Sequence, residues 1–482
     1  MNIITYFNQI LEENFKNYLK KYFNTINYTD KISKFSNYYN FINDLDDFSD
    51  NFMKQVIIGY FEYIDDCFFN SFYRKNYCVS NGFYERKNFV TLFGNINFKR
   101  RYYFDTKNNE WFFFTDLFLG LPKRKHFDPF VCSQICDESC SNSYSKAGKI
   151  ISNKIGKRTN NDINISRATA RNIVLSFNPE QNNETNKKRI ERLFVMLDEK
   201  FVGSQFNNGL DHMVKAAVIF EDTEKVYKTI GKKRIKDSKH IDRYRLISSH
   251  VCASIDNNLL NDTVNYIYNT YDTDYIKEIV FMGDCAKWIK NFPLSHWFKF
   301  TTQTKVKFAM DGFHFSQALN NLTTNKYKDV YDTLNNYVKN NNKEDFARLC
   351  NEFLDLNPTR KDTIINKRDY ILNNWNERQL YQNNPYMKCS MESHISHIFA
   401  DLFTSRPKAY SKSGLRKLLK LRVLKTNGVN IKQLYLNQLL SFNPSSLKKE
   451  KEEKTYKHPN IKYNKYDIEY KLLVKNNPFL LN

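Results

Sequence analysis

The chain begins with a region in which apolar and aromatic residues recur at helical spacing. Phe35, Tyr38, Ile42 and Leu45 illustrate the pattern, which extends over residues 1 to about 75. Apolar side chains three and four positions apart fall on one face of a helix. This stretch is therefore predicted to be an amphipathic helical region.

A β-rich patch follows the helical region. Two apolar runs, Phe89–Phe93 and Ile96–Phe104, predict a hairpin with Gly94-Asn95 at its turn. Trp111–Phe114 predicts a third strand.

Basic and aromatic residues stand side by side in the second strand of this hairpin. Lys99, Arg100 and Arg101 precede Tyr102 and Tyr103. Such a mixture suits a surface that binds nucleic acid. An edge strand whose charged side chains prevent it from pairing with another chain explains the mixture equally well.

Helical periodicity returns between residues 128 and 177. Two short helices are predicted over 141–155 and 166–177, with Ser166 as the N-cap of the second. Arg167 and Arg171 give the second helix a basic character, as in a helix that enters a major groove. The connection is longer than a helix-turn-helix motif requires, so an ordinary helical hairpin fits at least as well.

From residue 193 the pattern becomes that of a mixed α/β sheet, because several apolar runs of strand length precede alternating helix and strand. The predicted strands are Leu193–Leu197, Val214–Phe220, Lys225–Ile230, Ile279–Gly283 and Lys305–Met310. Helical periodicity covers 246–271 and again 314–382. The predicted fold class is therefore α/β.

The charge of the chain points to a polyanionic partner. The formal net charge is +22 over 482 residues, of which 41% are hydrophobic. A bias towards the residues of AT-rich codons accounts for the many Asn and some of the Lys, but not for so large an excess over Asp and Glu. This balance favours nucleic-acid binding.

Cysteine usage and apolar run lengths bear on the compartment. Nine cysteines without a framework spacing indicate reduced thiols, and Cys132, Cys136 and Cys140 recur every four residues along one helix face. A buried stripe explains this spacing better than a zinc site, which would need a fourth ligand. No apolar run reaches membrane-spanning length and no secretory signal is recognisable, so we expect a cytoplasmic protein.

Three acidic residues stand where a metal-dependent nuclease would need them. Asp198 and Asp284 each follow an apolar strand, and Glu392 opens the helical stretch Met391–Ala400. Any three of the 52 acidic residues could be chosen on spacing alone. A carboxylate directly after a buried strand is costly unless it serves a site, however. Carboxylates from rigid elements are the ligands that a pair of Mg²⁺ ions requires for phosphodiester chemistry.

The residues around these acids resemble a known family. Gly283-Asp284-Cys285-Ala286-Lys287-Trp288-Ile289, Asp311-Gly-Phe-His314 and the upstream Phe93-Gly-Asn-Ile-Asn-Phe-Lys-Arg-Arg-Tyr-Tyr103 are similar to the ISLre-type insertion-sequence transposases. These are distantly akin to Mutator-like transposases. The resemblance covers roughly residues 85 to 425.

The resemblance implies a ribonuclease-H-like core with a DDE triad and a helical insertion before the glutamate. Asp198, Asp284 and Glu392 would be the catalytic and metal-binding triad for two Mg²⁺ ions, with Mn²⁺ able to substitute. Asp311 and His314 would form an accessory motif that shapes the site or contacts DNA.

Two positions depart from the family pattern. The family usually has Glu-Ala-Asp-Gly around its first aspartate, whereas this chain has Met196-Leu197-Asp198-Glu199. Cys285 stands where glycine is usual, and it would be strained if that position requires a positive φ.

We therefore expect a bacterial DDE transposase that binds terminal inverted repeats, cuts DNA and joins its ends to a target. It would be nucleoid-associated and act as a homo-oligomer on DNA. A catalytically inactive, transposon-derived DNA-binding protein and a nuclease that does not join ends remain alternatives. The predicted DNA contacts are Lys99, Arg100, Arg101, Arg167, Arg171, Lys232, Lys233, Arg234 and Arg416.

The expected organisation has five parts. They are a helical region over 1–80, a hairpin and helical DNA-binding region over 81–180, a catalytic core formed by 191–312 and 383–425, a helical insertion over 313–382, and a basic tail over 426–482.

Overall fold

The structure is a computed structural model of the whole chain. It describes residues 5, 8, 9, 12, 13, 15, 16, 34–121, 125–159, 163–179, 186–205, 211–225, 228–230, 233–235, 244–324, 326–384, 387, 389–404 and 409–440. The chain divides into a compact unit, Met1–Leu436, and a second unit, Asn437–Asn482. The last described helix begins in the first unit and ends at Leu440, within the second. The part of the expected basic tail that follows Leu440 lies outside the described residues.

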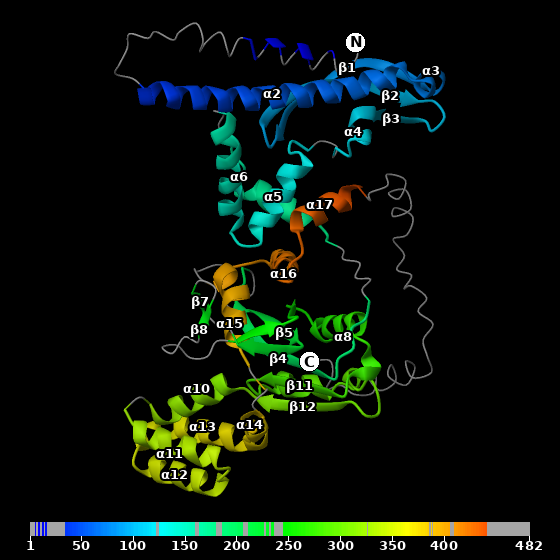
Figure 1. The fold of residues 1–482 in the computed structure, drawn as a ribbon. Coiled ribbons are helices and arrows are strands. Elements are labelled where there is room, and N and C mark those ends of the chain that lie inside the picture. Colours follow the sequence, from blue (N-terminus) through cyan, green and yellow to red (C-terminus); the bar gives the residue numbers. More distant parts are fainter. Residues whose placement is uncertain are drawn as a thin grey trace. The chain divides into compact units, whose positions relative to one another are not determined.

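A long helix lies against a small antiparallel sheet near the amino terminus (Figure 1). Helix α2 spans Lys34–Asn70, and α3 spans Phe72–Tyr77. Strands β1 (Cys78–Thr91), β2 (Gly94–Asp105) and β3 (Glu110–Phe113) form the sheet in that order. Strand β3 pairs only with the end of β2, from Tyr102 onward. Glu62 and Asp65 of α2 accept backbone hydrogen bonds from Lys99 (3.0 Å) and Arg101 (3.2 Å), which protects the remaining edge of β2.

The hairpin forms as predicted, but its turn lies two residues earlier. Thr91 pairs with Gly94, so the turn residues are Leu92 and Phe93. The Thr91 hydroxyl accepts a hydrogen bond from Phe93 N and donates one to Gly94 O, which closes the turn. Gly94 follows the turn with a φ of 112°, a conformation that favours glycine. The glycine does mark the hairpin, but it is the first residue of β2 and not a turn residue.

Three helices pack on one another after this sheet: α5 (Pro129–Ser139), α6 (Tyr144–Thr159) and α7 (Arg167–Ser176). Ser166 caps α7 by accepting a hydrogen bond from Thr169 N at 3.1 Å, as predicted. Cys132, Cys136 and Cys140 are all buried and free, which confirms the core-facing stripe.

The central sheet has five strands in the order β10-β5-β4-β11-β12. They span His250–Ser254, His212–Phe220, Arg192–Val202, Glu278–Gly283 and Lys305–Met310. Strands β10, β5 and β4 pair antiparallel, whereas β4, β11 and β12 pair parallel. The sheet is therefore mixed, as predicted.

Both faces of this sheet are buried. Along β4, Leu193, Val195 and Leu197 belong to one apolar core, and Phe194 and Met196 belong to the other. A strand covered on both faces reads as a continuous apolar run, which is why its sequence signal is strong.

The third antiparallel strand of the sheet was not predicted. Residues 250–254 form β10, so the predicted helical stretch over 246–271 is wrong in its first part; the helix there, α8, spans Leu259–Thr270. The run is five residues long, too short for periodicity to separate strand from helix. The strand predicted over 225–230 is likewise not in the central sheet. Two small ribbons occupy this region: β6 (Asp222–Lys225) with β9 (Tyr244–Ile247), and β7 (Lys228–Ile230) with β8 (Lys233–Ile235).

A bundle of helices follows β12 (Figure 1). It comprises α10 (Gly312–Thr323), α11 (Lys328–Lys339), α12 (Lys343–Asp355), α13 (Lys361–Asn373) and α14 (Trp375–Gln382). Then come α15 (Met391–Ile395), a π-helix (Ser396–Thr404), α16 (Lys412–Thr426) and α17 (Ile431–Leu440). Among the described residues, the remaining short helices are α4 (Phe114–Phe118), α9 (Lys287–Asn291) and four 3₁₀ turns at Thr273–Tyr275, Phe292–Leu294, His296–Phe298 and Pro358–Arg360. No described helix has the length and apolarity to cross a membrane.

Candidate metal centre

Asp198 lies inside the central strand rather than at its end. It pairs with Ala216 of β5, and this antiparallel pairing continues to Val202. On the other side, the pairing of β4 with β11 stops earlier, at Met196 and Met282. The prediction that the strand ends at Asp198 is therefore wrong. The aspartate stands where β4 has lost one of its two neighbours, which leaves room for a site.

Asp284 follows β11, on the neighbouring strand. The preceding Gly283 allows a close approach: a Cβ there would lie 2.8 Å from the Leu197 carbonyl oxygen and 2.7 Å from Ile289 Cγ2. The side-chain carboxylate of Asp284 accepts a hydrogen bond from Ala286 N at 2.8 Å, and the backbone carbonyl oxygen of Asp284 accepts one from the Tyr370 hydroxyl. Helix α13 thus touches the loop that carries this acid.

Cys285 adopts a φ of 67°, the left-handed conformation that favours glycine. The expectation of strain at this position is confirmed, because a non-glycine residue there costs on the order of 1 kcal/mol. The side chain is buried in an apolar core with Met310 and Phe315, which offsets part of that cost.

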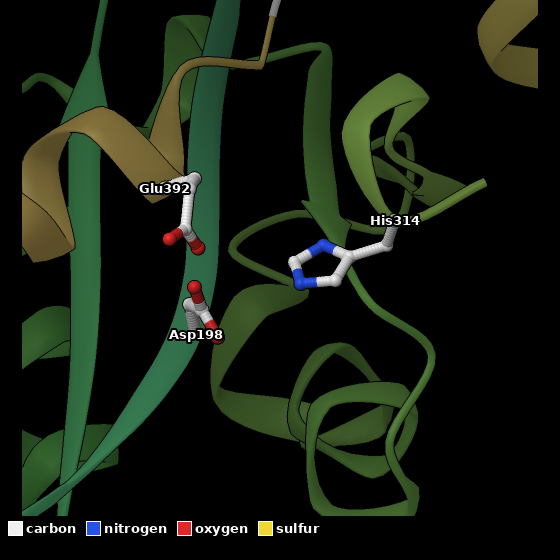
Figure 2. Close-up of side chains that lie close together, drawn as sticks. All are labelled: Asp198, His314 and Glu392. Carbon is white, nitrogen blue, oxygen red and sulfur yellow. The ribbon is translucent and has the colours of Figure 1, made fainter. Parts of the chain in front are cut away.

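Three side chains from separate elements converge at the site (Figure 2). Asp198 comes from β4, His314 from the first turn of α10 and Glu392 from α15. One potential ligand atom of each residue lies within 4.8 Å of those of the other two. Beside them is a cavity of about 480 Å³, lined by Asp311, Phe313, His314, Cys389, Ser390, Met391, Glu392, Ser396 and His397.

Asp311 fixes the orientation of His314. It caps α10, its Oδ1 accepting a hydrogen bond from His314 N at 2.8 Å. Its Oδ2 lies 2.6 Å from Nδ1 of the same histidine. Asp311 is buried, with 2% of its surface exposed. Because it engages Nδ1, it fixes the orientation of the imidazole, and Nε2 is the ring nitrogen that it does not engage.

The electrostatics of the site reflect crowded acids. Burial raises the pKa of Asp198 to about 7; its bond from Glu199 N and the His314 charge oppose the shift, while Asp284 and Glu392 add to it. Burial alone would lower the pKa of His314, but the hydrogen bond to Asp311 and the charges of Asp311, Asp198 and Asp284 raise it to about 9. Such shifts gather where a fold holds several ionisable groups for a function.

The donor set suits a divalent cation, with one difference from the expected triad. Asp198 and Glu392 come together as predicted, but the third member of the cluster is His314 and not Asp284. Asp284 acts on the cluster through its negative charge, which raises the pKa of both Asp198 and His314.

Two supporting contacts were not foreseen from the sequence. Trp288 Nε1 donates a hydrogen bond to Glu199, the residue after Asp198, and Lys215 Nζ lies 5.2 Å from the centre of the same indole ring. The hydroxyl of Tyr370 holds the Asp284 carbonyl, as described above. Each contact joins residues that are far apart in sequence, so no local sequence pattern predicts it.

Two of the predicted DNA-contacting residues are engaged within the fold. Arg100 is 8% exposed, pairs with Asp116 at 3.0 Å and stacks over Phe113. Arg101 bridges Asp65 and Asp66 of α2, at 2.7 Å each. Their burial and pairing do not fit the prediction that they contact nucleic acid. They join the hairpin to α2 and α4 instead.

The other predicted contacts differ in availability. Arg416 pairs with Asp256 at 2.8 Å, and Lys99 is exposed. Lys232 lies outside the described residues, and Lys233 and Arg234 belong to β8, where only the backbone is described.

Arg167 and Arg171 are exposed on α7, and neither bonds to another residue in the described part of the chain. They line a second cavity of about 480 Å³ together with Ser143, Tyr144 and Ser411. Ser143 and Ser411 stand at the amino ends of α6 and α16. Helix amino ends and unpaired guanidinium groups both favour anions.

Comparison with known proteins gives the chain a family. Residues 36–438 match the family described as "Uncharacterised protein family (UPF0236)". The chain belongs to the UPF0236 family. The matched span includes the central sheet, the helical bundle and all the residues of the site.

Relatives in this family occur in Caldanaerobacter subterraneus subsp. tengcongensis. One UPF0236 protein is 25% identical over 369 residues, which is 76% of this chain and 73% of the relative. A second is 24% identical over 375 residues, 77% of this chain and 74% of the relative. The name of the first relative joins eleven locus designations, and that of another joins four.

Proposed function

We propose that this UPF0236 protein is a DNA transposase that cleaves DNA and transfers strands with divalent cations. The observation that carries the proposal is the convergence of Asp198 and Glu392 on one point from β4 and α15. Phosphodiester chemistry needs such a cluster, because hard oxygen ligands from rigid elements can hold cations against the reacting phosphate.

The sheet supports a ribonuclease-H-like core. Strands β4, β5 and β10 lie side by side in the sheet and pair antiparallel, and β11 and β12 extend the sheet in parallel on the other side of β4. The central strand of this arrangement carries the first acid. The helical bundle α10–α14 stands between the second and third acids in sequence, as the resemblance to insertion-sequence transposases implies.

The residues of the chain have separable roles in this proposal. Divalent cations, when bound, activate the attacking oxygen and stabilise the leaving oxygen. Asp198 and Glu392 would hold them, and Asp284 would contribute negative charge at the edge of the cluster. Tyr370 bonds to the loop after β11, and Glu377 pairs with Lys290 of the following helix α9 (2.9 Å), so the bundle positions Asp284.

The surface supports DNA as the substrate. The net charge of +22 favours a polyanion. The cavity at Arg167 and Arg171 offers two unpaired guanidinium groups at helix amino ends, which suits a phosphate backbone.

The naming of the relatives supports a mobile element. One protein name covers eleven loci in a single organism. A gene that occurs many times in one genome is the expected product of transposition.

The decisive experiment is strand transfer with the full-length protein. The DNA substrate would carry the inverted repeats that flank the gene, in the presence of Mg²⁺ or Mn²⁺. We expect cleavage and joining by the wild type and by the control Asp274→Asn, an exposed acid away from the site. Asp198→Asn and Glu392→Gln should lose at least about 100-fold in rate.

Each other outcome has a distinct meaning. Full activity of Asp198→Asn would overturn the assignment of the site. Repeat-specific binding by the wild type without cleavage would favour the inactive DNA-binding alternative, and cleavage without joining would indicate a nuclease.

A further inference from the structure

A nitrogen atom stands among the oxygen ligands of the proposed metal centre. We propose that His314 Nε2 is a direct ligand, with Asp198 and Glu392, of a first-row transition cation such as Mn²⁺, which this site binds in preference to Mg²⁺. The inference deepens the proposed function and rests on it for the role of the cation in catalysis. The cation site itself can be tested without catalysis.

The first support is the way in which the imidazole is held. Asp311 engages Nδ1 at 2.6 Å and also caps the helix that carries the ring. A metal-binding histidine typically gives its second nitrogen to a carboxylate, which fixes the tautomer and makes the ligating nitrogen more basic. In Figure 2 the ring of His314 faces the carboxylates of Asp198 and Glu392. Asp311 and His314 thus form a carboxylate–histidine pair directed at the cluster.

The second support is the state of Asp198. The residue is only 6% exposed, and its carboxylate accepts a hydrogen bond from Glu199 N at 2.7 Å. No other hydrogen bond or ion pair to this carboxylate occurs within the described part of the chain. Burying a carboxylate is costly without a compensating charge. A cation between Asp198, Glu392 and His314 supplies that charge.

The third support is the chemistry of the donor set. Mg²⁺ requires near-octahedral oxygen coordination, and imidazole is a poor ligand for it. Imidazole suits first-row transition cations, and carboxylates suit Mn²⁺, so two carboxylates and one imidazole favour Mn²⁺ or a later metal of the series over Mg²⁺. The neighbouring cavity leaves space for water and a phosphate beside these three ligands.

The test is electron paramagnetic resonance of Mn²⁺ added to the full-length, metal-stripped protein. Titration gives the affinity, and electron spin-echo modulation from ¹⁴N reports a nitrogen bound directly to the ion. We expect ¹⁴N modulation in the wild type and at least about tenfold tighter binding of Mn²⁺ than of Mg²⁺, measured by competition.

Two substitutions make the test specific. His314→Gln removes the ring nitrogen but offers an amide oxygen, so it should abolish the modulation and shift the preference towards Mg²⁺. His397→Gln is the matched control, since His397 lines the same cavity but is outside the cluster. It should change neither the signal nor the affinity. Circular dichroism of both variants would verify that they are folded.

The results separate this inference from the proposed function. Modulation that persists in His314→Gln, or equal affinities for Mn²⁺ and Mg²⁺ in the wild type, would overturn the inference. Strand transfer that depends on Asp198 but is accompanied by no ¹⁴N signal would overturn the nitrogen ligand and leave the function standing. A ¹⁴N signal lost in His314→Gln, without any cleavage of DNA, would support the metal site and count against the transposase.

Discussion

Asp311 makes two bonds to the same residue: its Oδ1 accepts from the backbone N–H of His314, and its Oδ2 pairs with the Nδ1 of that histidine. The helix cap and the orientation of the imidazole therefore depend on one carboxylate. The two roles can be separated by substitution, because a cap needs only an acceptor, whereas the imidazole is also held by charge.

Asp311→Asn should keep the cap and weaken the hold on His314. Asparagine caps helices about as well as aspartate, so above pH 9, where His314 is neutral in both proteins, the free energy of unfolding should change by less than about 0.5 kcal/mol. Cation affinity should fall by roughly 10- to 100-fold. Denaturant unfolding and metal titration measure the two effects. Asp311→Ala should lose about 1 kcal/mol of stability as well, and an equal loss of stability in both variants would contradict this division of roles.

The metal-free protein should become less stable as the pH rises from about 4 to 9. The pKa of Asp198 is about 7 in the fold, above the roughly 3.9 of an unfolded aspartate, so the folded state binds more protons between these values. The pKa of His314 is about 9 in the fold against roughly 6.5 when unfolded, so its stabilising contribution is full below about 6.5 and is lost as the pH rises through 9. Both groups act in the same direction.

Asp198→Asn checks this dependence directly. At pH 8 and without metal, it should stabilise the protein by roughly 1–2 kcal/mol, because a buried carboxylate that the His314 charge compensates only in part is replaced by a neutral group. It should also remove the stabilisation that Mn²⁺ gives to the wild type. Thermal unfolding with and without Mn²⁺ measures both effects, and a variant less stable than wild type at pH 8 would argue against the shift.

The strain at Cys285 can be isolated by comparing two replacements. Cys285→Ala and Cys285→Gly both remove the thiol from the core, but only glycine is relaxed at a φ of 67°. The glycine variant should therefore be more stable than the alanine variant by about 1 kcal/mol. Chemical denaturation of the two proteins gives the difference. Alanine elsewhere is usually the more stable of the two, so the reversed order is the diagnostic result.

Arg167→Ala and Arg171→Ala should weaken DNA binding. If each side chain contacts one phosphate, each substitution should reduce the slope of log affinity against log salt by about 0.9. Fluorescence anisotropy over a range of salt concentrations measures it. Arg348→Ala, which removes an exposed arginine of α12 paired with Asp345, is the control and should leave the slope unchanged.

Arg100→Ala should affect folding rather than DNA affinity. It leaves the buried Asp116 with Arg86 as its remaining partner (3.1 Å), so we expect a loss of roughly 2–3 kcal/mol in the free energy of unfolding. Calorimetry and DNA titration of the same preparation separate the two effects. A stable variant with weakened DNA binding would restore the original prediction for this residue.

A strand can be predicted from its sequence where its local apolar pattern is strong. Strands β4, β11 and β12 were predicted because the sheet buries both faces and the sequence is apolar throughout. Strand β10 is short, and its place beside β5 depends on a pairing between distant segments that no local pattern encodes. Motif position points to Asp198 and Glu392, and to Asp311 and His314 as an accessory pair; that His314 lies within reach of both acids follows only from the geometry of α10.

For the basic residues, the sequence does not show which side chains are paired within the fold. Arg100 and Arg167 are equivalent by sequence, since each lies in a basic stretch beside apolar residues. Their partners decide between them: Asp116 reaches Arg100 inside the fold, and nothing in the described chain bonds to Arg167. Charge along a sequence predicts a class of partner, but not which side chains are free to meet it.

The two apolar cores on either side of β4 have a consequence for how the site can evolve. Neighbouring residues of β4 enter opposite cores. If the strand slipped by one position, Met196 would enter the core that now holds Leu197, and Asp198 would turn to the opposite face of the sheet. The acid therefore cannot drift along its strand by insertion or deletion without dismantling the sheet. A substitution in place leaves this register intact, and Cys285, with its φ of 67°, is a residue that the fold accommodates despite the strain.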